Sequence, residues 1–318
     1  MNNLNASILV QEASRRARAF VNSWRVIAPL ERGHLRLRHL STHIGILGGT
    51  GAGKSSAVVR TIVATSSRGR VPVVAFAAKD SDAKFYQAAW EGHEPPIVFA
   101  PGSDFVFDWL GYLQGLGLYA AEITNVFMGA AATVNPNAAA GEAFWDNSTR
   151  NLLTSVIEVL RAAQVPVTLG AIDRFVNELP QGPPDTRPPG PFVTHVLSTF
   201  TDGDGRLAKQ GHPPALSAAF DHLLQAWPQQ DARTASNILS SWQSVSGVLQ
   251  QSPLKELLTT PAEGQKVLSP ADVFDHGRSI IVDLPTLTTP LAGRVLQAIW
   301  LRCLLLGAAR QTRRRQIL

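Results

Sequence analysis

Residues 48 to 55 read Gly-Gly-Thr-Gly-Ala-Gly-Lys-Ser, a complete G-x-x-x-x-G-K-S phosphate-binding loop. The residues before this loop, His43 to Leu47, form a short apolar and β-branched run that is typical of a buried strand. The residues after it, Ser56 to Ala64, have the spacing of an amphipathic helix. A strand, a glycine-rich turn and a helix in this order predict a site for the phosphates of a nucleoside triphosphate.

Each part of the loop has an expected role in binding the nucleotide. The glycines let backbone N–H groups surround the phosphates, Lys54 neutralises phosphate charge as the catalytic lysine, and the Ser55 hydroxyl binds Mg²⁺. No residue pattern specific for a base is visible, so the loop alone does not separate ATP from GTP. The expected nucleotide contacts come from Gly48, Gly49, Thr50, Gly51, Ala52, Gly53, Lys54, Ser55 and Ser56.

The composition is that of a globular protein with a basic balance. Hydrophobic residues make up 45% and charged residues 17% of the 318 residues. The net charge of +5 and the pI near 9.7 favour polyanionic partners. The single cysteine, Cys303, excludes an internal disulfide framework, fits a reducing compartment and lies in an apolar run that predicts burial.

Targeting and membrane signals are not evident in the sequence. The N-terminus lacks the continuous apolar region of a signal peptide. The apolar segment Val295 to Ala309 is interrupted by Arg302 and is too short to span a bilayer. The sequence therefore predicts a soluble, cytoplasmic chain without a transmembrane segment.

Strand and helix patterns alternate in the first third of the chain. After an amphipathic helix over Ala6 to Trp24 and a basic connector, the sequence predicts strands over Val71 to Ala77 and Pro96 to Ala100, with a helix over Ala83 to Trp90 between them. This alternation indicates an α/β fold with a mostly parallel sheet that is covered by helices on both faces.

A mainly helical block interrupts this pattern. The clearest helices are those of Phe144 to Leu160, Thr168 to Leu179 and Ile238 to Leu249, and a Pro/Gly-rich loop follows the second of them. A strand over Arg278 to Pro285 restores the α/β pattern. It is followed by a helix over Leu291 to Arg310 and by the start of a further strand at Arg313 to Leu318. The predicted divisions are residues 1–40, 41–112, 113–258 and 259–318.

The order of these segments resembles the type IV coupling proteins, which are FtsK- and HerA-like ATPases of conjugation and type IV secretion. The likeness is carried by His43 to Ser56, Phe76 to Asp80, Phe144 to Leu153, Ala235 to Leu258 and Val267 to Pro285. Only the phosphate loop is specific by itself. The other segments contribute through their order and spacing.

The resemblance implies a RecA-like P-loop core interrupted by an all-helical domain. It also implies ATP and Mg²⁺ as cofactors, a homo-hexamer, and single- or double-stranded DNA as the translocated partner. A relaxase and components of the secretion apparatus are further implied partners. They would hold the protein at the cytoplasmic face of the inner membrane, although the N-terminal transmembrane helices common in the family are not found in this sequence.

Hydrolysis in this family needs an Asp-Glu pair at the end of a strand. Asp283 is one candidate for the metal-side aspartate, but Leu284 stands where the glutamate is expected. In the alternative register, Arg315 to Leu318 begins the Asp-Glu strand and the pair lies beyond Leu318. A chain with Lys54 and Ser55 but without the glutamate should bind Mg-ATP and hydrolyse it slowly.

Other charged residues have both functional and structural interpretations. Lys79, Asp80 and Asp82 follow a core strand, where open α/β sheets bind ligands, or they form a solvated loop. The basic run Arg310 to Arg315 is an arginine finger or a surface turn, and Glu142 and Asp146 belong to an exposed helix face. The leading functional hypothesis is a DNA translocase, and the alternatives are a nucleotide-binding adaptor without efficient turnover and a HerA-type DNA-repair ATPase.

Overall fold

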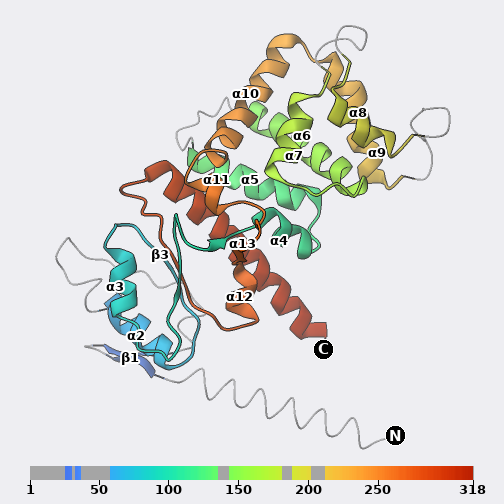
Figure 1. Cartoon of the computed structure of the whole chain (residues 1–318). Helices are drawn as coiled ribbons and strands as arrows, with labels where there is room; N and C mark the ends of the chain where they lie inside the picture. Colours follow the sequence, from blue (N-terminus) through green and yellow to red (C-terminus); the bar gives the residue numbers. More distant parts are fainter. Residues whose placement is uncertain are drawn as a thin grey trace, which may run out of the picture. The chain divides into compact units, whose positions relative to one another are not determined.

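The protein is a mixed α/β chain that is mostly helical and contains small sheets (Figure 1). The computed structural model describes residues 26–30, 33–36, 58–134, 143–180, 188–201 and 212–317, with side chains only within 58–134, 147–180, 188–201 and 212–311. The predicted helix over Ala6 to Trp24, the predicted strand over His43 to Leu47 and the whole phosphate loop, Gly48 to Ser56, lie outside these residues.

The chain divides into two compact units. The first comprises residues 1–75, 81–97 and 277–281, and the second comprises residues 76–80, 98–276 and 282–318. This division does not coincide with the four sequence-based segments, because stretches distant in sequence join the same unit.

The first unit contains an antiparallel hairpin and two helices among its described residues. β1 (Val26–Leu30) pairs with β2 (Gly33–Arg36) where the sequence predicts only a basic connector. α2 (Arg60–Arg68) extends beyond the helix predicted after the phosphate loop, and α3 (Asp82–Ala88) confirms the helix predicted next. The ion pair between Arg68 and Glu91, at 2.9 Å, joins the end of α2 to the residues that follow α3.

A three-stranded sheet has the order β3 (Val74–Phe76), β7 (Ile280–Val282), β4 (Ile97–Phe99). The main-chain N–H of Ile280 donates to Val73, and that of Ala77 donates to Val282, so residue numbers rise together along β3 and β7. The same relation holds for β7 and β4, and the sheet is therefore parallel. All three residues of β7 are buried, as expected for a central strand.

The division between the two units passes through these strands. Each strand begins in the first unit and ends in the second. The second unit starts at Phe76 in β3, at Val98 in β4 and at Val282 in β7. The two remaining short strands, β5 (Phe105–Val106) and β6 (Lys266–Val267), pair in parallel within the second unit.

The regular elements of more than one residue that are described between β5 and β6 are helices. They are α4 (Trp109–Gly115), α5 (Ala120–Val134), α6 (Ala143–Ala162), α7 (Leu169–Asn177), α8 (Pro191–Ser198), α9 (Pro214–Phe220), a π-helix (Asp221–Ala226), a 3-10 turn (Trp227–Gln229), α10 (Ala232–Leu249) and α11 (Leu254–Leu257). α12 (Pro270–Phe274) follows β6. These bounds agree with the predicted helical interruption of the strand pattern.

Side-chain caps explain where several of these helices begin. Asp108, Thr168 and Asp231 each accept a hydrogen bond from a main-chain N–H in the first turn of α4, α7 and α10. Ser269 and Asp272 form a reciprocal capping box at the start of α12. The capping threonine of α7 is the residue at which the sequence predicts that helix to start.

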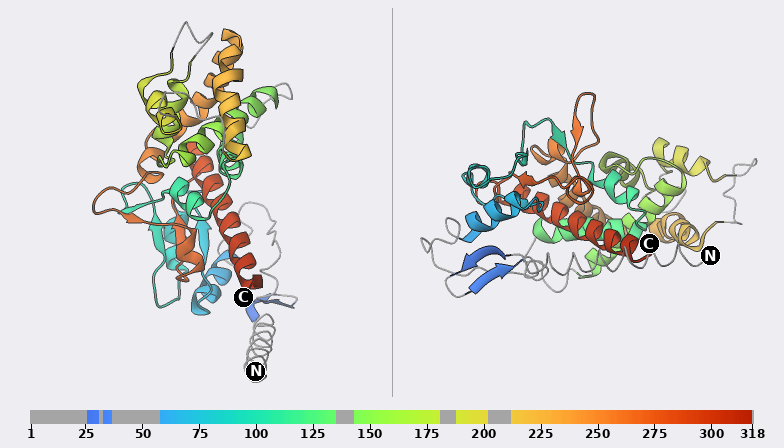
Figure 2. Two further views of the ribbon diagram at one scale, coloured as in Figure 1. Left: turned by 90° about the vertical axis from the view of Figure 1, so that its right-hand side faces the viewer. Right: turned by 90° about the horizontal axis from the view of Figure 1, so that it is seen from below.

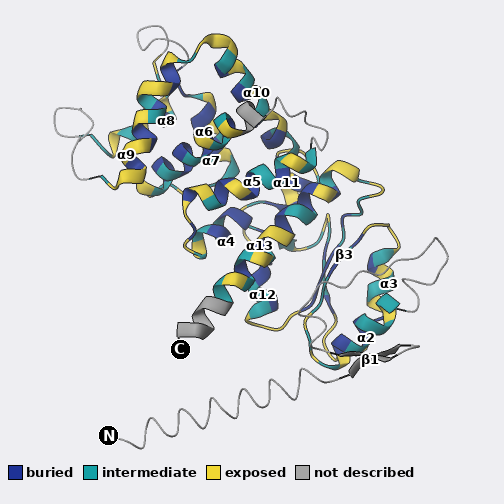
Figure 3. Cartoon of the chain, turned by 180° about the vertical axis from the view of Figure 1, so that it is seen from behind, coloured by how far each residue is buried: buried dark blue, intermediate teal, exposed yellow. Residues whose placement is uncertain are grey.

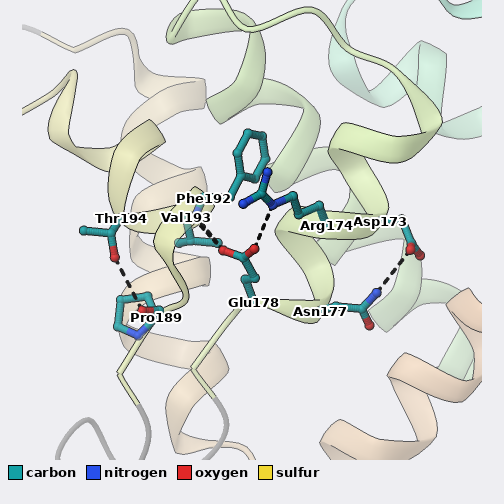
Figure 4. A network of polar contacts seen from close by, with 8 residues as sticks. All are labelled: Asp173, Arg174, Asn177, Glu178, Pro189, Phe192, Val193 and Thr194. Carbon is teal, nitrogen blue, oxygen red and sulfur yellow. Dashed lines mark hydrogen bonds and ion pairs between the residues drawn. The ribbon is translucent and has the colours of Figure 1, made fainter.

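Glu178 joins the end of α7 to the beginning of α8 (Figure 4). One carboxylate oxygen accepts hydrogen bonds from the main-chain N–H groups of Phe192 and Val193 in the first turn of α8, and the other is 2.8 Å from the Arg174 guanidinium. Partial burial alone would raise the pKa of Glu178, but the hydrogen bonds from Arg174, Phe192 and Val193 together hold the pKa below its ordinary value. The charged carboxylate thus stabilises the beginning of α8.

The helical block has an aromatic and aliphatic core. The described part of the predicted stripe on α6 is buried, and Leu152, Val156 and Ile157 have no exposed surface, whereas the side chains of Phe144 and Trp145 lie outside the described residues. Phe127 of α5 stacks edge-on against Trp109 of α4 and Trp242 of α10. Figure 3 shows these helices buried on one side and exposed on the other. Trp242 is a packing group, as predicted, because it is fully buried.

α13 (Pro290–Ile317) is a single long helix (Figure 2). The strand predicted to begin at Arg313 is wrong, because residues 313–317 continue the helix. These residues contain neither Gly nor Pro, arginine and glutamine are good helix formers, and cations are favourable at a helix C-terminus. Cys303 lies on the buried side of α13, as predicted.

One segment of α13 bears on the expectation that no transmembrane segment is present. Pro290–Gln311 is long and apolar enough to cross a membrane. Its most apolar 18-residue window has a mean hydropathy of 1.4, and 39% of that window is buried in the structure. The sequence-based expectation considered only the shorter stretch from Val295 to Ala309. Length and composition are weak evidence for a membrane span, because a core helix of a soluble protein passes the same test.

Candidate nucleotide-binding site

The residues predicted to bind the nucleotide lie outside the described part of the chain, so their roles stay predictions. What the structure describes is the carboxyl edge of the parallel sheet, where α/β proteins bind ligands. Within the second unit, this edge brings together the segment after β3, residues 77–80, and the segment after β7, residues 283–289.

Hydrogen bonds hold these two segments side by side. The main-chain N–H of Leu287 donates to the carbonyl of Ala78 at 3.0 Å, and the Thr288 hydroxyl donates to a carboxylate oxygen of Asp80 at 2.7 Å. The side-chain amide of Gln297, on α13, donates to the carbonyl of Ala77 at 2.8 Å. The turn after β3 is therefore bonded both to the turn after β7 and to α13.

Asp283 occupies the first position after the central strand. Its main-chain N–H donates to the carbonyl of Phe99 at 2.8 Å, which extends the pairing of β7 with β4 by one residue. Asp283 is half-buried, whereas Lys79 and Asp80 are exposed. This placement agrees with the predicted position of all three residues at the carboxyl end of core strands.

A close approach of α13 fixes the path of the chain after Asp283. An added Cβ on Gly293 would lie 2.7 Å from the carbonyl oxygen of Leu284 and 3.1 Å from Cα of Thr286. Any larger residue at position 293 would therefore meet the main chain of this turn. The Thr289 hydroxyl also donates to the carbonyl of Pro285 at 2.7 Å, which closes the turn on itself.

Sequence reasoning did not identify Thr288, Gln297 or Gly293. A visible signal was the threonine-rich stretch between the strand and Pro290, since threonine hydroxyls commonly bond to nearby main-chain groups in turns. The Gln297 contact could not be predicted from the sequence, because its partner, Ala77, follows β3 and is far away along the chain.

The side chains of the described residues bear on the predicted metal site. Among them, no group of three or more His, Cys, Asp or Glu residues gathers that could hold a metal ion. Hydroxyl and carboxylate oxygens are ligands that Mg²⁺ prefers, but Ser55 lies outside the described residues, so binding of Mg²⁺ by Ser55 and Asp283 stays a prediction.

The other charged candidates have structural roles or lie outside the described residues. The Arg310 guanidinium donates to the carbonyl of Gly117 at 3.3 Å, which fits a structural role. The side chains of Arg313 to Arg315 and of Asp146, together with Glu142, lie outside the described residues. Asp82 is the first residue of α3, where a negative charge is favourable.

Comparisons with known proteins add no family assignment. No known family model matches the chain, and no curated protein or solved structure is significantly similar to it. The resemblance to coupling proteins therefore rests on the sequence segments alone.

Proposed function

We propose that this chain is the ATP-binding motor domain of a DNA-translocating ATPase resembling the type IV coupling proteins. The observation that carries the proposal is the phosphate loop, Gly48 to Ser55, in a chain whose parallel sheet has Asp283 at the carboxyl end of its central strand. The phosphate loop of a RecA-like core precedes a helix and belongs to a sheet of this kind. The helical block between β5 and β6 supports the same proposal.

The proposed roles follow from the chemistry of each residue. Lys54 and the main-chain N–H groups of the loop bind the phosphates, and the Ser55 hydroxyl binds the Mg²⁺ that accompanies ATP. Asp283 orients water around that ion through its carboxylate. The hydrogen bond from Thr288 holds Asp80 at the same edge of the sheet. Mg-ATP supplies the energy of phosphoryl transfer when it is bound.

DNA is the proposed translocated partner. A net charge of +5 and a pI near 9.7 favour binding to a polyanion. Only the resemblance to coupling proteins supports the proposal of a homo-hexamer, a relaxase partner and secretion components as partners. Localisation in the cytoplasm, at the inner face of the membrane, is proposed on the same basis.

A second candidate function is a nucleotide-binding adaptor without efficient hydrolysis. The observation that favours it is Leu284, which follows Asp283 where a hydrolytic pair has glutamate. In the alternative register, the Asp-Glu pair follows a strand that begins at Arg315. Residues 313–317 are helical, so the structure does not contain the start of that strand. An adaptor of this kind would bind Mg-ATP and recruit a partner through the bound state.

The deciding experiment measures nucleotide binding and turnover with the full chain. We expect a fluorescent ATP analogue to bind in the presence of Mg²⁺, and Lys54→Ala to weaken it roughly 10- to 100-fold through the loss of a charge-assisted contact. Lys84→Ala, at an exposed position of α3, is the matched control and should bind normally. Ser55→Ala should reduce the dependence of binding on Mg²⁺.

Phosphate release with and without DNA then separates the two functions. Turnover that DNA stimulates and Lys54→Ala abolishes supports the motor. Binding without turnover, with or without DNA, supports the adaptor. If neither ATP nor GTP binds to the unmodified chain, both functions are excluded.

A further inference from the structure

A pocket of about 250 Å³ lies in the helical block of the second unit. It is formed where the first residues of α4 and α7 meet the last turn of α10 and the residues around α11 (helices labelled in Figure 1). All of its lining residues fall within 108–260, and none of them belongs to the sheet edge described above. The volume is below the range of about 300–1,000 Å³ that is typical of ligand pockets, so the pocket suits only a small organic molecule.

The walls of the pocket combine an apolar base with polar groups. Trp109, Leu110, Leu249 and Leu258 are buried and supply the apolar surface. The polar contribution comes from hydroxyl, amide and ammonium groups. The side chains that carry them are Thr168, Thr259, Thr260, Gln250 and Lys255.

The charges of the lining favour an anion. Lys255 is exposed, and its ammonium makes no ion pair in the structurally described part of the chain. The lining also contains one carboxylate, that of Asp108, but it already accepts a hydrogen bond from the main-chain N–H of Gly111 at 3.0 Å. Its negative charge is therefore partly compensated by the start of α4, whereas the positive charge of Lys255 is available to a ligand.

We propose that this pocket binds a small organic anion, in which a carboxylate or phosphate group is attached to an apolar body. The Lys255 ammonium pairs with the anionic group, the threonine hydroxyls and the Gln250 amide donate hydrogen bonds to it, and the apolar body lies against Trp109 and the leucines. The lining shares no residue with the predicted nucleotide site, and the inference does not depend on the proposed motor function.

Gly170 provides a way to block the pocket without disturbing the packing. It lines the pocket on the first turn of α7, and an added Cβ would meet no atom within 4 Å. A leucine at this position would extend into open space and is also a better helix former than glycine. Gly247 on α10 is equally open but does not line the pocket, so Gly247→Leu is the matched control.

The test uses the full chain and three small probes in ligand-observed NMR titrations. Phenyl phosphate and benzoate carry the two anionic groups on an apolar ring, and benzyl alcohol is the neutral counterpart. We expect at least one anion to bind roughly tenfold more tightly than benzyl alcohol. Preference for one of the two anions identifies the group that the site takes.

The variants then locate the binding. Lys255→Gln should weaken the anion roughly tenfold, and Gly170→Leu should abolish its binding. Gly247→Leu and Lys266→Gln, at an exposed lysine outside the pocket, should leave it unchanged. Circular dichroism verifies that each variant is folded. The proposal is overturned if neither anion binds, if benzyl alcohol binds equally well, or if folded Gly170→Leu still binds the anion.

Discussion

The Thr288 hydroxyl donates a 2.7 Å hydrogen bond to the Asp80 carboxylate, although 208 positions separate the two residues in the chain. This bond joins the turn after β7 to the turn after β3 at the carboxyl edge of the sheet. Both residues are exposed, so water competes for each partner and the bond contributes modestly to stability. Its main effect is to fix the position of two loops next to Asp283.

The Thr288–Asp80 bond can be measured by a double-mutant cycle. Thr288→Val and Asp80→Asn should each lower the free energy of unfolding by about 0.5–1 kcal/mol, because each weakens or removes a hydrogen bond in an exposed place. The double variant should lose less than the sum of the two, since both changes affect the same bond. Urea unfolding provides the values. Strict additivity would mean that the two residues do not interact in solution.

Gly293→Ala should destabilise the second unit. The new methyl group would lie 2.7 Å from the Leu284 carbonyl oxygen, and α13 would have to move away from the turn that follows Asp283. We expect a loss of about 1–3 kcal/mol in the free energy of unfolding, as for other overpacked sites. Gly247→Ala, where an added Cβ meets nothing within 4 Å, should be neutral or stabilising. An equal effect of both variants in urea unfolding would contradict the close approach.

The Glu178 network predicts a stability that depends on pH. The pKa of Glu178 is lowered in the folded state, so its contribution is fully present above the pKa of the unfolded chain and is lost as pH falls through the folded pKa. Glu178→Gln should therefore be less stable than the unmodified protein at pH 7, and the difference should shrink as the pH falls below about 4.

Thermal unfolding across this pH range measures the effect of Glu178. Glu263→Gln, at an exposed position in the loop before β6, is the control and should not reproduce the pH-dependent difference. A gap between the unmodified protein and Glu178→Gln that stays constant from pH 7 to pH 3 would show that the carboxylate charge is not what stabilises α8.

Cys303 should be protected from thiol reagents in the folded protein. It has no exposed surface, and burial raises the pKa of its thiol, so the reactive thiolate is scarce. We expect labelling by a disulfide reagent at pH 8 to be at least about a hundredfold slower in buffer than in denaturing urea. Because Cys303 is the only cysteine, the labelled mass has a single interpretation. Rapid stoichiometric labelling in buffer would contradict its buried position on α13.

Local patterns were sufficient to predict several of the helices and strands. β3, β4 and β7 are short apolar runs bounded by turn residues, and α7 begins at the threonine that caps it. The stripes of α6 and α10 have helical spacing because one face of each helix is buried. In these places the local preference and the tertiary environment favour the same structure.

Features that depend on distant residues could not be predicted. The position of β7 between β3 and β4 is set by hydrogen bonds to strands far away along the chain, and the pocket depends on how the ends of four helices meet. The strand predicted over Arg313 to Leu318 was wrong because a short run of charged and apolar residues fits either structure, and α13 had no breaker to end it. The nucleotide contacts of Gly48 to Ser56 stay predictions.

The strand order also constrains how the molecule assembles. During synthesis β3 and β4 leave the ribosome early. β7, the strand that lies between them, is made only after residues 100–279 have been made. Until Ile280 arrives, each of the two outer strands lacks the neighbour to which it is bonded in the finished sheet. Assembly of the sheet is therefore a late and intrinsically slow step, which must wait for the whole helical block and leaves the nascent chain dependent on protection from aggregation.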